Sequence, residues 1–199
     1  MLERRVRDTL EAGDADGAAT LFMRHFGGDI LSFLAGRLHG SPEASDVFSA
    51  FAEDFWRGLP AFRWQTSLRS WAYTLARNAA FRHQTAARRR RRRFEPLTSA
   101  SRYGEEVARL HSATRQCLRT EFKERVRRLR EQLPPDDHTL LILRVDRKLS
   151  WKELAVVLSG KGESLRPAEQ VRWAARLRQR FQTVKRKLRE LARADGLLP

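Results

Sequence analysis

The sequence predicts an all-α protein made of two small helical domains joined by a flexible linker. Apolar residues recur at the three- and four-residue spacing of a helix face in successive segments, and no segment has the clear alternation of a strand. The stretch 94–104 breaks this periodicity with turn-forming residues. We therefore expect one domain over residues 1–93 and another over residues 105–199, with residues 94–104 as the linker.

The first 60 residues carry the signals of three successive helical segments. A short amphipathic helix is expected from Leu2 to Leu10, and a second apolar stripe runs from Ala18 to Leu38 with an interruption at Gly27-Gly28. Ser41-Pro42-Glu43 then combines a cap, a proline at the first helical position and an acid in the first turn. This signal predicts a helix that runs to about Gly58.

The stretch from Phe62 to Arg93 combines a polar, aromatic loop, a capped helix and six consecutive arginines at its end. Thr66 or Ser67 can accept hydrogen bonds from the first free N–H groups of this helix. One helix face is apolar and is expected to be buried, whereas Arg69, Tyr73 and Arg77 are expected on the opposite face. Arginines beside aromatics suit phosphates and stacked bases. An ordinary amphipathic helix with a solvated charge run fits the pattern about equally well.

The second half ends in a pattern typical of a helix-turn-helix. A helix is expected from Glu105 to Leu133, and a short helix follows Pro134-Pro135. Ser150-Trp151-Lys152-Glu153 is a capping box, residues 159–164 form a turn, and Pro167 starts a long basic helix. In a helix-turn-helix the last helix enters the DNA major groove. A helical hairpin with a solvated basic face has the same pattern, so both interpretations stay open here.

The charge of the chain predicts a polyanionic partner. Forty Lys and Arg against 24 Asp and Glu give a net charge of +16, which favours nucleic acid first and an anionic membrane surface second. The first 60 residues contain more acids than bases, so the positive excess lies in the remainder and suggests two kinds of partner. Cys117 is the single cysteine, which fits a reducing cytosol. We expect no signal peptide and no membrane insertion.

Catalysis has little support in the sequence. The histidines are scattered without metal-ligand spacing, and neither a nucleophile motif nor a glycine-rich nucleotide loop is present. Gly160-Lys161-Gly162 lacks the spacing of a phosphate loop and follows a helix rather than a strand. The expected protein is therefore not an enzyme, and it has no cofactor, metal or small-molecule substrate.

Specific residues in both halves match a known family. The first half resembles region 2 of bacterial sigma factors of the extracytoplasmic-function group in these segments: Asp46-Val47-Phe48, Phe55 to Arg63, Ser67 to Tyr73, Ala76-Arg77-Asn78 and Arg88-Arg89-Arg90. The second half resembles region 4 of the same family in three segments: Leu133 to Asp136, Leu149 to Ala155 and Lys187 to Leu191. The resemblance implies an alternative sigma factor in the bacterial cytoplasm, associated with the nucleoid as part of the polymerase holoenzyme.

The resemblance also assigns partners and residues. Region 2 binds the clamp of core RNA polymerase, which implies contacts by Asp46, Val47, Phe48, Phe51, Glu53 and Asp54. Region 2 also captures and opens the −10 promoter element, which implies contacts by Phe62, Arg63, Trp64, Gln65, Thr66, Ser67, Arg69, Arg77 and Asn78. Region 4 binds the polymerase flap and reads the −35 element, which implies contacts by Ser150, Arg176, Arg178, Gln179, Arg180 and Lys185. An anti-sigma protein is a further implied partner.

The chain departs from the family pattern at three places. Ser49 and Ala50 stand where a glutamine and an acid are usual, and Trp64 stands where glycine is usual. The stretch from Ser159 to about Ala174 is longer than the family's turn, so the recognition helix either starts early, at Pro167, or follows an insertion. Three other functions stay open: a helix-turn-helix regulator of duplex DNA that acts without polymerase, an RNA-binding helical module, and a degenerate relative that acts as an antagonist.

Overall fold

The computed structural model describes residues 2–39, 41–93 and 115–198, and these residues form helices and helical turns without a strand. The predicted all-α class is confirmed. The predicted linker, residues 94–104, and residues 105–114 of the expected long helix lie outside the described residues. The helices of the first half are α1 (Leu2–Glu11), α2 (Ala15–Arg37), α3 (Ala44–Gly58), the turn η1 (Leu59–Ala61) and α4 (Leu68–Arg93).

Local signals fix most helix starts in the first half. Asp14 caps α2 by accepting from the N–H of Gly17 at 2.7 Å, and α2 then continues through Gly27-Gly28 without a break. Helix α3 begins at Ala44, two residues after the predicted first position at Pro42. Ser41 Oγ accepts from the N–H of Glu43 in a turn that precedes the helix. Ser67 is the cap of α4, since its Oγ accepts from the N–H of Ser70 at 3.2 Å.

The second half consists of α5 (Arg115–Glu131), α6 (Pro135–Leu141), the π-turn η2 (Ile142–Asp146), α7 (Trp151–Ser159), η3 (Gly162–Ser164) and α8 (Pro167–Ala194). The predicted capping box of α7 is present, with Ser150 Oγ accepting from the N–H of Glu153 and the carboxylate of Glu153 accepting from the N–H of Ser150. The last helix starts early, at Pro167, which decides between the two predicted alternatives.

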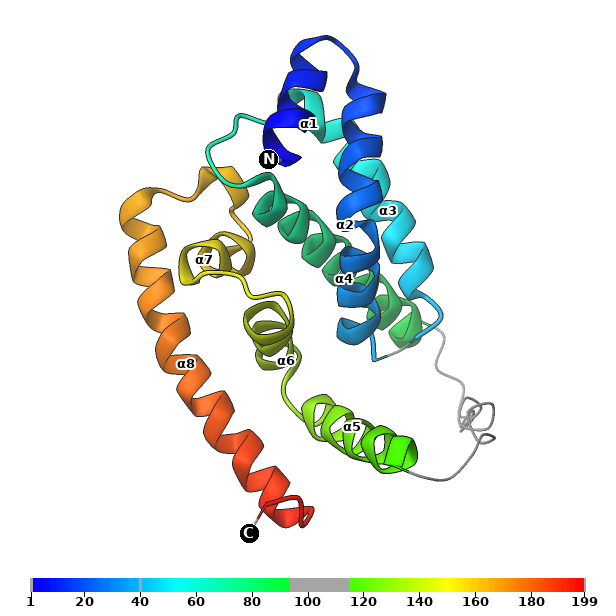
Figure 1. Cartoon of the computed structure of the whole chain (residues 1–199), viewed down its shortest axis with the longest axis vertical. Coiled ribbons are helices and arrows are strands. Elements are labelled where there is room, and N and C mark those ends of the chain that lie inside the picture. Colours follow the sequence, from blue (N-terminus) through cyan, green and yellow to red (C-terminus); the bar gives the residue numbers. More distant parts are fainter. Residues whose placement is uncertain (1, 40, 94–114, 199) are drawn as a thin grey trace.

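The two halves pack against each other around α4. Figure 1 shows α6 and α7 between α4 and α8, and α7 packs against both of these helices. One continuous core joins buried residues of α2, α3 and α4 to Leu143, Leu154 and other residues of the second half. The expectation that Tyr73 faces away from the buried side of α4 is wrong. Its side chain is fully buried and contacts the edge of Phe33, because α4 has helices on both sides.

Candidate nucleic-acid interface

The loop 62–67 is built on stacked aromatic rings. Phe62 is buried and lies 4.8 Å from Trp71 and 4.9 Å from Trp64, measured between ring centroids. Trp64 adopts a left-handed backbone with φ of +59°, which only glycine adopts without strain. The guanidinium of Arg7 lies 5.5 Å from the centroid of the Trp64 ring. The loop therefore presents a half-buried indole that contacts the ring of Phe62 and the guanidinium of Arg7.

A cleft of about 640 Å³ lies between this loop and α1. Its walls come from the residues Glu3, Arg4, Arg7, Asp8, Glu11, Trp64, Thr66 and Ser67. The hydroxyl of Thr66 is buried and has no hydrogen-bond partner within the described part of the chain. An aromatic wall with hydrogen-bonding groups around it suits a planar, polar ligand such as an unpaired base.

The second half covers the other side of the loop. The N–H groups of Arg63 and Gln65 donate to the carboxylate of Glu163, each at 3.1 Å. The hydroxyl of Ser67 also lies 3.4 Å from the carboxylate of Glu153. Loop residues from the predicted −10 set are therefore held by acids from the half that is predicted to read the −35 element.

Arg69 and Arg77 of α4 are only partly exposed. Arg69 donates to the carbonyl oxygen of Arg147 at 2.6 Å, and Arg147 in turn pairs with Asp29 at 2.6 Å. Arg77 and Asn78 are half-buried on the same helix. Burial raises the pKa of the neighbouring Tyr73 phenol above its usual value. In this arrangement Arg69 of α4 helps to hold the two halves together.

The predicted polymerase-binding helix, α3, divides into buried and exposed residues. Val47 and Phe51 lie in the core with 2% and 0% of their surface exposed, so they support the helix and do not reach a partner. Asp46 and Glu53 are exposed, and Phe48 is half-buried. Asp54 forms an ion pair with Arg82, while Glu53 pairs with Arg57 at 2.5 Å. The accessible part of this set is therefore acidic, with one aromatic edge.

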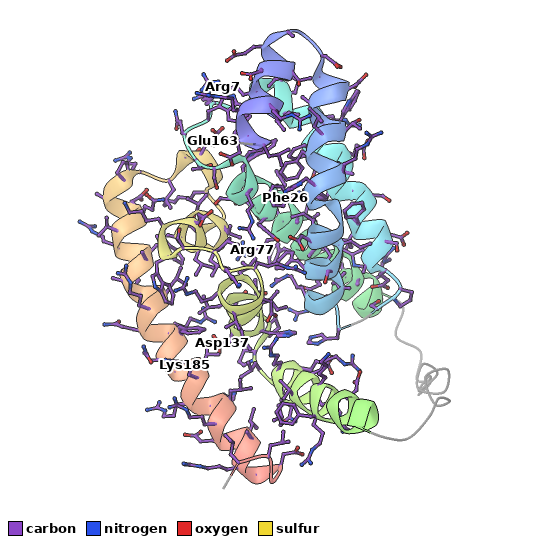
Figure 2. All side chains as sticks on the ribbon, viewed as in Figure 1. Arg7, Phe26, Arg77, Asp137, Glu163 and Lys185 are labelled. Atoms are coloured by element: carbon purple, nitrogen blue, oxygen red, sulfur yellow. The ribbon has the colours of Figure 1, made fainter. Side chains whose placement is uncertain are left out.

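The residues predicted to read the −35 element lie on α8 except Ser150, which caps α7. Arg176 and Gln179 are exposed on α8. Arg178 lies over the Trp151 ring at 5.8 Å, and Arg180 donates to Asp137 at 2.5 Å. Lys185 lies 5.5 Å from the Phe181 ring and is half-buried, as Figure 2 lets the reader follow along α8. The exposed arginines and the glutamine can bond guanine and adenine edges, respectively.

Comparison with known proteins shows which family this chain resembles. Residues 22–93 match the model of sigma-70 region 2. The chain also aligns with the RNA polymerase sigma-H factor of Pseudomonas aeruginosa, at 27% identity over 159 residues, which covers 78% of this chain and 82% of that protein. An alignment of this length cannot fit within the first half, so the similarity to the sigma-H factor extends into the second half of the chain.

Sequence reasoning missed the acids that the second half of the chain brings to the loop. Glu153 was identified only as part of a capping box, and Glu163 was one residue of a turn. Arg144, which lies 4.7 Å from the Trp151 ring, was missed as well. None of these contacts follows from helical periodicity, because each partner lies on another element or turn.

Over residues 2–39, 41–93 and 115–198, no group of three or more His, Cys, Asp and Glu side chains is arranged to hold a metal ion. In the same ranges, no helix combines the length and the apolar character needed to cross a membrane.

Proposed function

We propose that this chain is an alternative sigma factor of the extracytoplasmic-function group, which binds core RNA polymerase and directs it to a set of promoters. One observation carries the proposal: the chain contains two separate constellations suited to DNA, an aromatic loop with a cleft and a basic helix-turn-helix. A regulator of duplex DNA needs only the second. The sigma factor acts in the bacterial cytosol, where an anti-sigma protein is a further partner.

In this proposal the first half, residues 1–93, opens the −10 element. An unpaired base enters the cleft beside Trp64, where Thr66 supplies a hydroxyl that has no other described partner. Taking a base out of its stack costs a few kcal/mol. Stacking on an aromatic side chain returns about 1–3 kcal/mol per base, so the loop offsets much of that cost.

The remaining surfaces have separate roles in the same proposal. The exposed acids of α3, Asp46 and Glu53, together with the edge of Phe48, contact the polymerase clamp. The second half, residues 105–199, binds the flap, and α8 enters the major groove of the −35 element through Arg176 and Gln179. Net positive charge strengthens both DNA contacts without adding sequence preference.

Reconstitution with core polymerase tests the proposal. The purified chain is mixed with core RNA polymerase and a promoter library, and transcripts are mapped. We expect a holoenzyme and transcripts that share upstream elements. If no holoenzyme forms and no transcripts start, the sigma function is wrong. Asp46→Arg should weaken holoenzyme assembly, whereas Glu190→Arg, which changes another exposed acid by the same charge, should leave it intact.

A further inference from the structure

The backbone of the loop between η1 and α4 binds an anion supplied by the chain itself. The carboxylate of Glu163 accepts from the N–H groups of Arg63 and Gln65, and all three nitrogen–oxygen distances are 3.1 Å. The residue between the two donors, Trp64, has φ of +59°. Neighbouring N–H groups around a left-handed residue form a concavity that binds anions. Glu163 comes from the other half, 100 positions after Arg63.

The turn 160–164 places the carboxylate of Glu163 against the loop. Gly160 and Gly162 have φ of +72° and +53°, so the chain reverses within a few residues. A Cβ on Gly160 would lie 3.4 Å from the guanidinium of Arg77, and one on Gly162 would lie 3.8 Å from Thr74. The turn therefore runs close along α4 toward the loop, as the positions of Arg77 and Glu163 in Figure 2 illustrate.

The chemistry of the contact indicates which external ligand the site takes. A carboxylate and a phosphodiester both present anionic oxygens to N–H donors in charge-assisted hydrogen bonds. The cleft and the side chain of Trp64 belong to the same loop as these donors. Donors to a phosphate beside a wall for a base are the two elements of a single-strand binding surface. Glu163 therefore occupies the place of a phosphate group.

We propose that the N–H groups of Arg63 and Gln65 form a phosphate site for single-stranded DNA, which Glu163 occupies until the two halves separate. The inference rests on the proposed function, in which unpaired DNA meets this loop. Docking of the second half and binding of the strand are then mutually exclusive. Only the molecules in the open state can bind the strand. The apparent affinity of the free chain is therefore the affinity of the open state multiplied by the fraction of molecules in that state. Binding of the halves to clamp and flap would favour that open state.

The test compares Glu163→Ala with Glu190→Ala in the full-length chain. Both variants lose one negative charge, but Glu190 lies on α8, where 65% of its side chain is exposed and it pairs with Arg186. Binding of a short random-sequence single-stranded DNA pool is measured by fluorescence anisotropy over a salt series. Relative to Glu190→Ala, we expect Glu163→Ala to bind about tenfold more tightly.

Hydrogen exchange gives a second measurement that needs no DNA. The amides of Arg63 and Gln65 should exchange faster in Glu163→Ala than in the unmodified chain and in Glu190→Ala. Equal DNA affinity in the two variants would overturn the inference. So would unchanged exchange at the two amides.

Failure of the inference differs from failure of the proposed function. If the chain forms a holoenzyme that starts transcripts while Glu163→Ala behaves like Glu190→Ala, only the inference is wrong. If no variant starts transcripts with core polymerase, the sigma function is wrong. If in addition no variant binds the DNA pool, the phosphate site is wrong as well.

Discussion

Trp64 combines a strained backbone conformation with an aromatic ring that can stack on a base. A left-handed backbone costs a residue with a Cβ about 1–2 kcal/mol, and it persists where surrounding contacts hold it. Here the contacts are the carboxylate of Glu163 bound to both flanking N–H groups, the ring of Phe62 and the cation of Arg7. The conformation that forms the anion site also places the indole at the edge of the cleft.

Substitutions of Trp64 distinguish the contribution of its aromatic ring to DNA binding from that of its left-handed backbone conformation. Trp64→Asn tolerates the left-handed conformation but lacks the ring, so we expect it to lose about 1–3 kcal/mol of binding to the unpaired −10 strand. Trp64→Tyr keeps an aromatic wall and should lose less than half of that. The measurement is the affinity of the holoenzyme for the strand of a mapped promoter. Equal losses in both variants would show that the ring does not stack on a base.

At the scale of elements, some polar and basic residues of α8 are free to contact DNA, whereas others contact the protein itself. Arg176 and Gln179 are exposed, whereas Arg180 pairs with Asp137 of α6, whose side chain is 18% exposed. The side chain of Arg180 is 46% exposed, so Arg180 can leave Asp137 and contact DNA, but the largely buried carboxylate of Asp137 then loses its partner, which costs stability. The ion pair therefore reduces, but does not abolish, the DNA contact expected of Arg180.

Two variants test this division. Arg180→Ala should cost about 1–3 kcal/mol at one −35 base pair and little at the others, if Arg180 reads a base edge. Asp137→Asn frees Arg180 and should strengthen duplex binding for every sequence, since it removes a competing anion. Both are measured by duplex affinity over a set of single-base variants. A loss in Arg180→Ala that is uniform over all sequences would identify a phosphate contact instead.

The contact between α6 and α2 predicts a pH dependence of stability. His138 of α6 is 5% exposed and stacks on His39 at 5.6 Å between ring centroids. Burial, together with the charges of His39 and Arg130, lowers the pKa of His138 from 6.5 to about 4. The unfolded chain therefore binds a proton between these two values that the folded chain does not bind, and stability falls as pH falls through this window.

Urea unfolding across this pH range measures the effect. Stability should be full above pH 6.5 and should decrease toward pH 4 by about 2–3 kcal/mol, at 1.36 kcal/mol for each unit of pKa. His138→Phe cannot titrate and should flatten this slope. His25→Gln, at an exposed position, should keep it. A slope unchanged in His138→Phe would assign the effect to other groups.

At the scale of the whole molecule, periodicity predicted helices but not their mutual packing. The apolar stripe of α4 and the capping box of Ser150 and Glu153 follow from short spacings, and the structure contains both. The burial of Tyr73 did not follow, because it depends on the second half covering α4. The bonds of Glu163 did not follow either, since a surface acid in a turn carries no signal of a partner 100 positions away.

A cavity placed in the core that both halves share tests whether they unfold as one cooperative unit. Leu154 of α7 is fully buried in the core that includes residues of α2 and α4. Leu154→Ala should cost about 2–5 kcal/mol, as cavities in well-packed cores do. Because the core is shared, we expect hydrogen exchange to accelerate in both halves by the same free energy.

Val184→Ala is the matched control, since Val184 packs in the separate small cluster with Leu133 and Leu141. It should accelerate exchange mainly in α5, α6 and α8. Faster exchange confined to the second half in Leu154→Ala would show that the halves unfold independently. The closed arrangement would then be too weak to keep Glu163 on the loop.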